Sequence, residues 1–127
     1  MDSTDAITVV DAPVVCRISP TVDLLFSRWT TPILWTLHRS GRLRFGELER
    51  RLGTITPKVL TERLRQLERD GLVRRQYFPE VPPRVEYEIT DLGESLSPVF
   101  AALADWTDDH LPAVEQARSA YNGPLPR

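Results

Sequence analysis

The feature that most constrains the fold of this chain is a pair of short amphipathic segments on either side of a turn of about four residues. Apolar residues recur at helical spacing in both segments, at Phe45, Leu48 and Leu52 and then at Leu60, Leu64 and Leu67. Thr56 suits the N-cap of the second helix, and Pro57 suits its first position because the N–H that proline lacks has no partner there. Gly71 is expected to stop this helix after Asp70. The sequence therefore predicts a helix-turn-helix.

A β-hairpin is predicted directly after this unit. Apolar residues alternate there with polar ones, which is the period of a half-buried antiparallel pair, at Val73 and Tyr77 and then at Val85, Tyr87 and Ile89. The connection over 79–84 contains three prolines, so it should project as a stiff loop with Arg84 near its base or tip. A hairpin in this position is a wing.

Further short elements are predicted before the helix-turn-helix. One helical face carries four large apolar groups, Trp29, Ile33, Leu34 and Leu37. Ser40 and Gly41 end that helix. A shorter apolar pattern over 21–25 indicates another helical segment, and residues 42–44 can add a strand to a small sheet.

A last helix is predicted from Thr90 onward. Its apolar residues are spaced 4, 3, 4 and 3 apart, as in a coiled-coil seam, at Leu92, Leu96, Val99, Leu103 and Trp106. The alternative is an amphipathic helix packed on its own domain, and two heptads do not decide between them. Pro98 lies inside this helix and should kink it near Glu94 and Ser95.

Together these elements predict a mainly α, α+β fold. It is a winged helix-turn-helix with a small antiparallel hairpin as the wing and dimerisation helices at both ends. The expected organisation is a flexible N-terminal arm over 1–15, the winged helix-turn-helix domain with its dimerisation helices over 16–110, and a partly helical or disordered tail over 111–127. Because the apolar groups exceed what one small core can cover, we expect a homodimer whose interface contains Leu24, Leu25, Leu96, Val99, Leu103 and Trp106.

Charge is distributed unevenly along the chain. The formal net charge is -2, yet residues 28–75 hold twelve basic and five acidic side chains, a net charge of +7. Residues 90–117 hold six acidic side chains and no Lys or Arg. This polarity suits a protein that docks one side on a polyanion such as duplex DNA.

The second helix of the pair is expected to be the recognition helix that contacts DNA. Its N-terminus favours a phosphate near Thr54, Thr56 and Lys58, and Thr61 and Arg65 lie further in, able to reach base edges. Additional contacts with DNA are assigned to the wing at Arg84 and to the flanking residues Arg44 and Arg28, for which a merely solubilising role is the alternative. The alternative is a solvated helix face on which Glu62 pairs with Arg65 or Arg69.

Other function classes find little support. No apolar run reaches the length of a membrane span, and Asp2 and Asp5 stand where a secretory signal carries positive charge, so a cytoplasmic protein is expected. One cysteine and two histidines make no metal cluster, and no cofactor-binding motif or Ser-His-Asp set can be assembled, so the chain is not expected to be an enzyme. A winged-helix module that binds protein through its heptad helix, without specific DNA binding, is the alternative function.

The sequence resembles the HxlR family of bacterial regulators, relatives of the MarR winged-helix proteins. The resemblance spans about residues 16–106 and is carried by Cys16 and by the blocks RWTTPIL (28–34), LRFGEL (43–48), ITPKVLTERL (55–64), LERDGLV (67–73), PPRVEY (82–87) and LGESL (92–96).

The resemblance implies a homodimer formed by the N-terminal helices and the long helix after the wing. Both recognition helices would then enter successive major grooves of a near-palindromic operator. It also implies a redox or electrophile sensor at Cys16, which fits a redox- or electrophile-responsive repressor. The chain has no second cysteine, which leaves a bridge between the two Cys16 thiols of a dimer or an adduct with a small oxidant or electrophile. By residue chemistry alone Cys16 is either a thiol activated by Arg17 or a small apolar filler.

Overall fold

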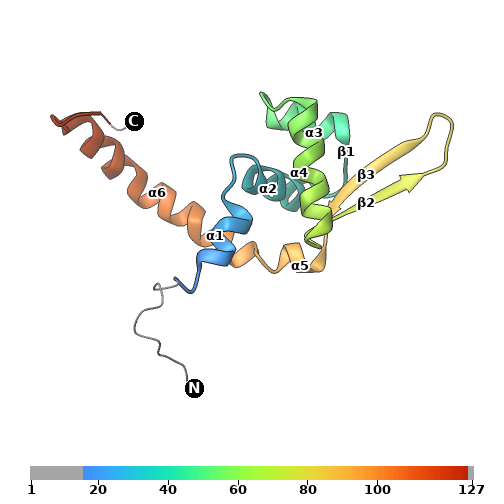
Figure 1. The fold of residues 1–127 in the computed structure, drawn as a ribbon, viewed down its shortest axis with the longest axis horizontal. Helices are drawn as coiled ribbons and strands as arrows, with labels where there is room; N and C mark the ends of the chain where they lie inside the picture. Colours follow the sequence, from blue (N-terminus) through green and yellow to red (C-terminus); the bar gives the residue numbers. More distant parts are fainter. Residues whose placement is uncertain (1–15, 126–127) are drawn as a thin grey trace, which may run out of the picture.

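The computed structural model describes residues 16–125, and the flexible arm predicted for 1–15 lies outside them. Figure 1 shows helices and a small sheet gathered into one body, from which the last helix extends as an arm. In chain order the elements are α1 (Ser19–Leu25), α2 (Thr30–Ser40), β1 (Leu43–Arg44), α3 (Phe45–Leu52), α4 (Pro57–Arg69), β2 (Val73–Phe78), β3 (Arg84–Ile89), α5 (Asp91–Glu94) and α6 (Ser97–Ala120). The predicted winged helix-turn-helix is confirmed.

The core is built from the apolar residues whose spacing predicted the helices. Ile33, Leu34 and Leu37 of α2 are fully buried, and so are Leu48 of α3 and Leu60 of α4. Gly41 and Gly71, which end α2 and α4, both have φ of 77°, a conformation that L side chains rarely adopt. These two glycines let the chain turn sharply into β1 and β2.

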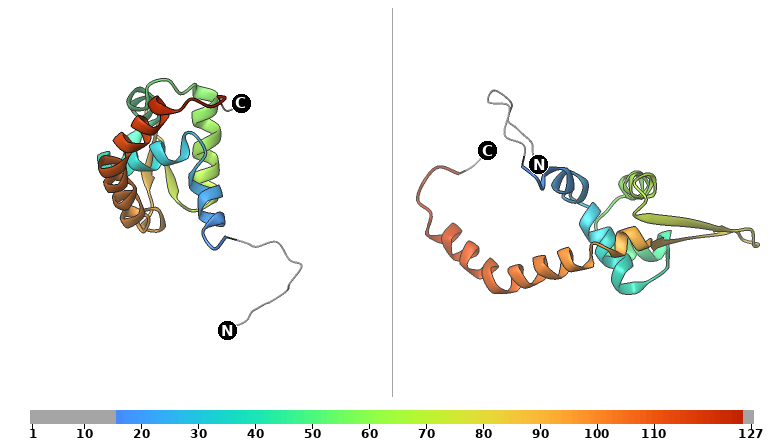
Figure 2. Two further views of the ribbon diagram at one scale, coloured as in Figure 1. Left: turned by 90° about the vertical axis from the view of Figure 1, so that its left-hand side faces the viewer. Right: turned by 90° about the horizontal axis from the view of Figure 1, so that it is seen from below.

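The sheet has the strand order β1-β3-β2, with all neighbours antiparallel. Tyr87 of β3 lies between Leu43 of β1 and Arg75 of β2 in the register. Because side chains alternate across a strand, Arg75 and Tyr87 share one face of the sheet, and Arg74 and Glu88 share the other. Figure 2 shows the hairpin of β2 and β3 extending beyond the helices as a wing.

The helix predicted from Thr90 is two helices, which corrects the expected kink at Pro98. The short α5 begins after Thr90, whose hydroxyl accepts a hydrogen bond from the Gly93 N–H (3.1 Å), and it ends at Glu94. α6 starts afresh at Ser97 with Pro98 in its first turn, where a missing N–H costs no helical bond. Pro98 therefore begins a helix and does not bend one.

α6 extends well beyond the body. It runs from Ser97 through residue 110 to Ala120 with Pro112 inside it, so the predicted domain boundary at 110 falls within a continuous helix. Its first half anchors it, since Phe100 is buried, 3% exposed, against α2, where its ring meets that of Trp35 edge to face. Its second half leaves the body, as Figure 1 and the right-hand view of Figure 2 show.

Candidate nucleic-acid interface

The local sequence around Thr56 fixes where α4 begins. The Thr56 hydroxyl accepts a hydrogen bond from the Val59 N–H (3.2 Å), as an N-cap residue does. Leu60, Leu64 and Leu67 then face the core, which turns the polar side of α4 outward. On that side Lys58, Glu62, Arg65 and Arg69 are all exposed.

The exposed face of α4 is largely free of internal ion pairs. Among residues 16–125, neither Lys58 nor Arg65 makes a salt bridge, and Glu62 pairs with neither Arg65 nor Arg69. Arg69 approaches only its neighbour Asp70, at 3.4 Å. The ion pairs of the alternative solvated face are therefore not formed, and the two cations at 58 and 65 are available to a ligand.

Thr61 has a local partner but keeps capacity for another. Its hydroxyl donates to the Pro57 carbonyl (2.8 Å) one turn earlier in α4. A hydroxyl that donates in this way can still accept, so the oxygen of Thr61 can receive an N–H from a base edge.

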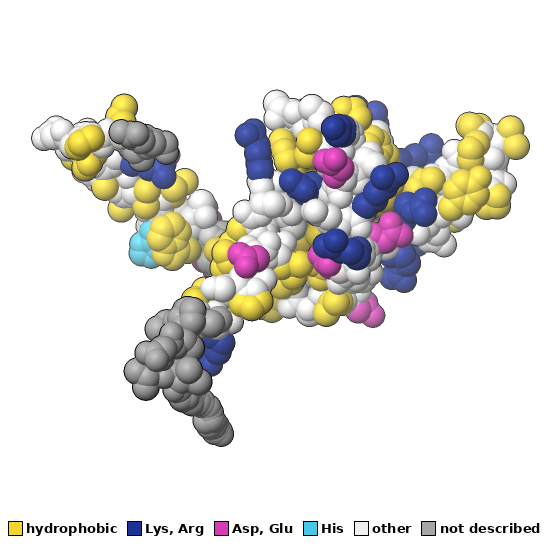
Figure 3. Space-filling view, viewed as in Figure 1, with side chains coloured by type: hydrophobic (Ala, Val, Ile, Leu, Met, Phe, Trp, Pro, Cys, Tyr) yellow, Lys and Arg dark blue, Asp and Glu magenta, His cyan; other side chains and the backbone are white. Residues whose placement is uncertain are grey.

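Arg84, expected to contact DNA from the wing, is paired within its own chain. Its guanidinium Nη1 lies 2.7 Å from Glu80 and its Nε lies 2.9 Å from Glu86, and the group stacks 4.1 Å from the centroid of the Phe78 ring. The side chain is only 23% exposed. Two carboxylates thus offset the charge of Arg84, and the tip of the wing presents apolar groups such as the fully exposed Val81. Figure 3 shows apolar side chains at this tip and Lys and Arg over α3, α4 and the base of the hairpin.

The two flanking arginines, Arg44 and Arg28, make no hydrogen bond to α4 among the described residues. Arg44 is exposed at the start of α3, where its backbone N–H donates to Glu47 (2.8 Å). Arg28 lies between α1 and α2 with its guanidinium 5.3 Å from the centroid of the Trp29 ring. Within the described part of the chain, neither arginine is bonded to α4.

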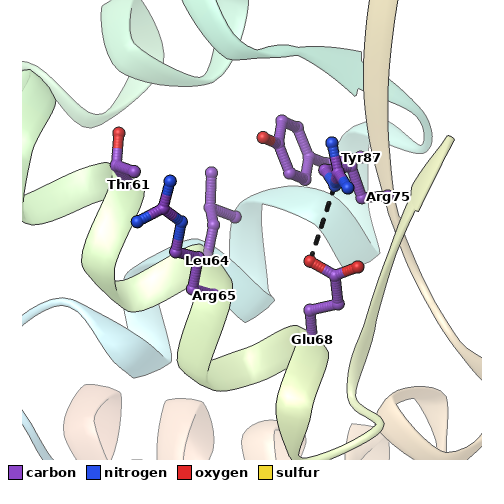
Figure 4. A pocket seen from close by; sticks show the side chains of 6 residues that line it. All are labelled: Thr61, Leu64, Arg65, Glu68, Arg75 and Tyr87. Atoms are coloured by element: carbon purple, nitrogen blue, oxygen red, sulfur yellow. Dashed lines mark ion pairs between the residues drawn. The ribbon is translucent and has the colours of Figure 1, made fainter. Parts of the chain in front are cut away.

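A cavity of about 200 Å³ lies between α4 and the sheet. Figure 4 shows side chains from both elements around it, and its lining residues are Thr61, Leu64, Arg65, Glu68, Arg75 and Tyr87. The Nε of Arg75 lies 3.6 Å from a Glu68 carboxylate oxygen. Sequence analysis missed Arg75 and Tyr87. Their place on the strand face shared with Val73 and Ile89 could have revealed them.

Cys16 is an exposed free thiol just before α1. Hydrogen bonds from the backbone N–H of Ile18 and from the Ser19 hydroxyl lower the pKa of the thiol. The lowering comes from groups at the start of α1, and the sequence had suggested the charge of Arg17 as its cause.

The residues assigned to a dimer interface divide into two groups. Leu25 is fully buried in the core of its own chain, which corrects its assignment, and Leu96 is half-buried against that core. Leu24, Val99, Leu103 and Trp106 are 36%, 39%, 39% and 54% exposed. Figure 3 shows apolar groups along α6 on the visible face.

Three residues of the kinds found in a serine–histidine–carboxylate triad lie close together where α2, α5 and α6 converge. His38 Nδ1 lies 2.5 Å from Glu94, and the Ser97 hydroxyl lies 3.5 Å from the same nitrogen. In such a triad one ring nitrogen of the histidine accepts the proton of the nucleophile, and the other ring nitrogen donates a hydrogen bond to the carboxylate. Here serine and carboxylate approach one nitrogen, so this cluster joins three helices and does not activate a nucleophile. Among the residues described, there is no metal-ligand cluster and no helix fit to cross a membrane.

Comparison with known proteins places these features in context. Residues 24–115 match the family described as HxlR-like helix-turn-helix. The chain is 47% identical over 92 residues to the HTH-type transcriptional regulator YtfH of Escherichia coli (strain K12), which is 72% of each protein. It is similar to the redox regulator HypR in its reduced form (TM-score 0.75, 32% identity, 80% of this chain and 99% of that one). It is also similar to the reduced transcriptional regulator YodB from B. subtilis (TM-score 0.68, 35% identity, 76% and 95%).

Proposed function

This chain belongs to the HxlR-like helix-turn-helix family and is a DNA-binding transcriptional regulator, and from that premise we propose that it reads a specific duplex sequence through α4 as a homodimer. The observation that carries the proposal is the exposed face of α4, where Lys58 and Arg65 have no ion-pair partner among residues 16–125. Cations left without partners on a helix beside a wing are suited to phosphates and base edges.

The contacts divide by depth along α4. Thr54, Thr56 and Lys58 lie at its N-terminus, where N–H groups and the helix dipole favour a phosphate. Thr61 and Arg65 lie one and two turns further in, and a guanidinium can bind guanine through two hydrogen bonds. Arg44 and Arg28 are proposed as flanking phosphate contacts, since both are exposed.

Replacing Arg65 and Lys58 separately should distinguish these two kinds of contact. We expect Arg65→Ala to lose about 1–3 kcal/mol of preference for the DNA upstream of the protein's own gene over random duplex. Lys58→Ala should weaken binding to both duplexes alike and lower the slope of log affinity against log salt by about one. Fluorescence titrations over a range of salt concentrations measure both effects. Equal losses on both duplexes for Arg65→Ala would place Arg65 on phosphate instead.

The homodimer proposal rests on the exposed apolar side chains of α1 and α6. Val99, Leu103 and Trp106 lie on one side of α6 and are exposed, as is Leu24 of α1. A row of exposed apolar side chains is typical of a surface that another protein covers. A symmetric dimer buries the same patch on both copies and sets the spacing of the two α4 helices.

We further propose that Cys16 makes the regulator responsive to oxidants. HypR is a redox regulator and YodB is described in a reduced form, and Cys16 is exposed with a thiol whose pKa is lowered. Oxidation by diamide would join the two Cys16 sulfurs of a dimer, with diamide taking up two electrons and two protons. Operator affinity of Cys16→Ser should then be indifferent to diamide, and an equal response of both proteins would remove Cys16 as the sensor.

The pH dependence of alkylation tests the chemistry of this thiol. Because the thiolate is the nucleophile and the pKa is lowered, the iodoacetamide reaction should reach half its maximal rate at a lower pH than in a short cysteine peptide. Ser19→Ala removes a hydrogen bond to the thiolate and should move the midpoint upward. Arg17→Gln is the matched control and should leave the midpoint in place. A midpoint equal to that of the peptide would contradict the proposed activation.

A further inference from the structure

The arginines of the sheet divide between its two faces. On the face away from α4, Arg74 lies 3.4 Å from Glu88 and Arg84 lies 2.9 Å from Glu86. Arg42 approaches both glutamates at 3.6 Å. Each of these arginines therefore faces carboxylates on the sheet itself. Arg75 lies on the opposite face, toward α4 and the cavity.

The volume of the cavity and the charges that line it suit a small anion. Its volume of about 200 Å³ is several times the roughly 30 Å³ that a water molecule occupies in the liquid, so it has room for a phosphate group. Arg65 and Arg75 bring two positive charges to its lining, and Glu68 brings one negative charge. In Figure 4 the Tyr87 ring extends from the sheet toward α4 with its hydroxyl at the cavity.

The ion pair between Glu68 and Arg75 is loose. The 3.6 Å separation of Arg75 Nε and the carboxylate is long for a charge-assisted hydrogen bond, and the two side chains are 50% and 41% exposed. Exposed pairs of this kind are weak. A phosphate oxygen can therefore take the place of Glu68 against the guanidinium.

We propose that this cavity binds one backbone phosphate of the DNA, held by the Arg75 guanidinium and the Tyr87 hydroxyl, with Glu68 as the internal competitor that the phosphate displaces. The proposal rests on the proposed function, because α4 brings the DNA to the cavity. It assigns the phosphate contact of the β2–β3 hairpin to Arg75 and not to Arg84. Arg65, which lines the cavity from α4 and is exposed, remains able to reach a base.

The protonation state of Tyr87 suits this role. Burial raises the pKa of its hydroxyl, the Glu68 charge raises it further, and the Arg75 and Arg65 charges each lower it by less than burial raises it. The group stays protonated at neutral pH and can donate to a phosphate oxygen.

The test compares single variants on random duplex and on the upstream duplex over a range of salt concentrations. Arg75→Gln should weaken binding to both duplexes about tenfold and lower the salt slope by about 0.9, the value for one phosphate. Tyr87→Phe should weaken both severalfold without changing the slope by a full phosphate. Glu68→Gln should strengthen both. Arg84→Gln, the comparison variant, should stay within about twofold of the unmodified protein.

Two results would overturn the assignment. One is an Arg75→Gln slope equal to that of the unmodified protein, and the other is an Arg84→Gln slope that falls instead. Thermal melting of each variant ensures that only folded proteins are compared. If inorganic phosphate at constant ionic strength competes with DNA for the unmodified protein but not for Arg75→Gln, a DNA phosphate and a free phosphate share the Arg75 site, as the proposal expects.

Failure of the proposed function gives a different pattern. An unmodified protein that binds random and upstream duplex equally well refutes sequence-specific reading. The salt slopes on random duplex still test the phosphate site, because a backbone contact needs no particular sequence.

Discussion

Replacing Gly93 with alanine is expected to destabilise the protein by about 2–4 kcal/mol and to lower its melting temperature by about 10 °C. A Cβ at this position would lie 2.5 Å from the Leu72 carbonyl oxygen and would also overlap the Ile89 side chain. The carbonyl has little freedom to move, because it accepts a hydrogen bond from the Thr90 N–H at 3.0 Å. Chemical denaturation and thermal melting measure the loss.

Gly46→Ala is the matched control for this substitution. Gly46 is also helical, and among the described residues a methyl group there would meet only the flexible end of Arg50, at 3.6 Å. Alanine favours a helix over glycine by about 1 kcal/mol, so this variant should be as stable as the unmodified protein or slightly more so. Equal stability of Gly93→Ala and Gly46→Ala would show that α5 does not pack closely against Leu72 and Ile89.

Trp106→Asp should dissociate the proposed dimer without unfolding the chain. Trp106 is 54% exposed on α6, so its loss removes little from the core. Burying a large aromatic group is worth about 2–3 kcal/mol, and a symmetric interface contains it twice, so the dimer dissociation constant should rise by about three to four orders of magnitude. Sedimentation measures this change, and thermal melting checks that the monomer stays folded.

Ala101→Asp provides the control for charge on α6. At about 100° per residue, Ala101 lies on the side of α6 opposite Val99, Leu103 and Trp106, and it is exposed. The same new carboxylate placed there should leave association unchanged. A folded monomer of the unmodified protein at micromolar concentration would refute the dimer. Equal dissociation by both variants would refute this side of α6 as its interface.

Hydrophobic spacing and cap residues predicted most of the fold. The bounds of α2, α3 and α4 follow from leucine periodicity together with Gly41, Thr56 and Gly71, because these signals are local. The break before α6 was mistaken for a kink, since Pro98 suits either the first turn of a helix or a bend within one.

Side-chain partners were harder to predict than elements. Leu25 and Leu24 are equally apolar, and only the packing of α1 against the body decides that Leu25 is in the core and Leu24 is exposed. The charge of Arg84 is offset by Glu80 and Glu86 because of the hairpin's local shape and register, which spacing alone does not specify. Strand alternation places Arg75 on the same face as Val73 and Ile89, but its proposed role also depends on α4 packing over that face.

The most direct test of the central claim is a hydroxyl-radical footprint of the unmodified protein on the DNA upstream of its own gene, at moderate salt. A dimer that reads a specific sequence through two α4 helices should protect two segments on one face of the duplex, with centres about 34 Å or 10 base pairs apart. Trp106→Asp should lose the paired pattern. Uniform protection along the duplex, or none where random DNA competes equally well, would contradict the account.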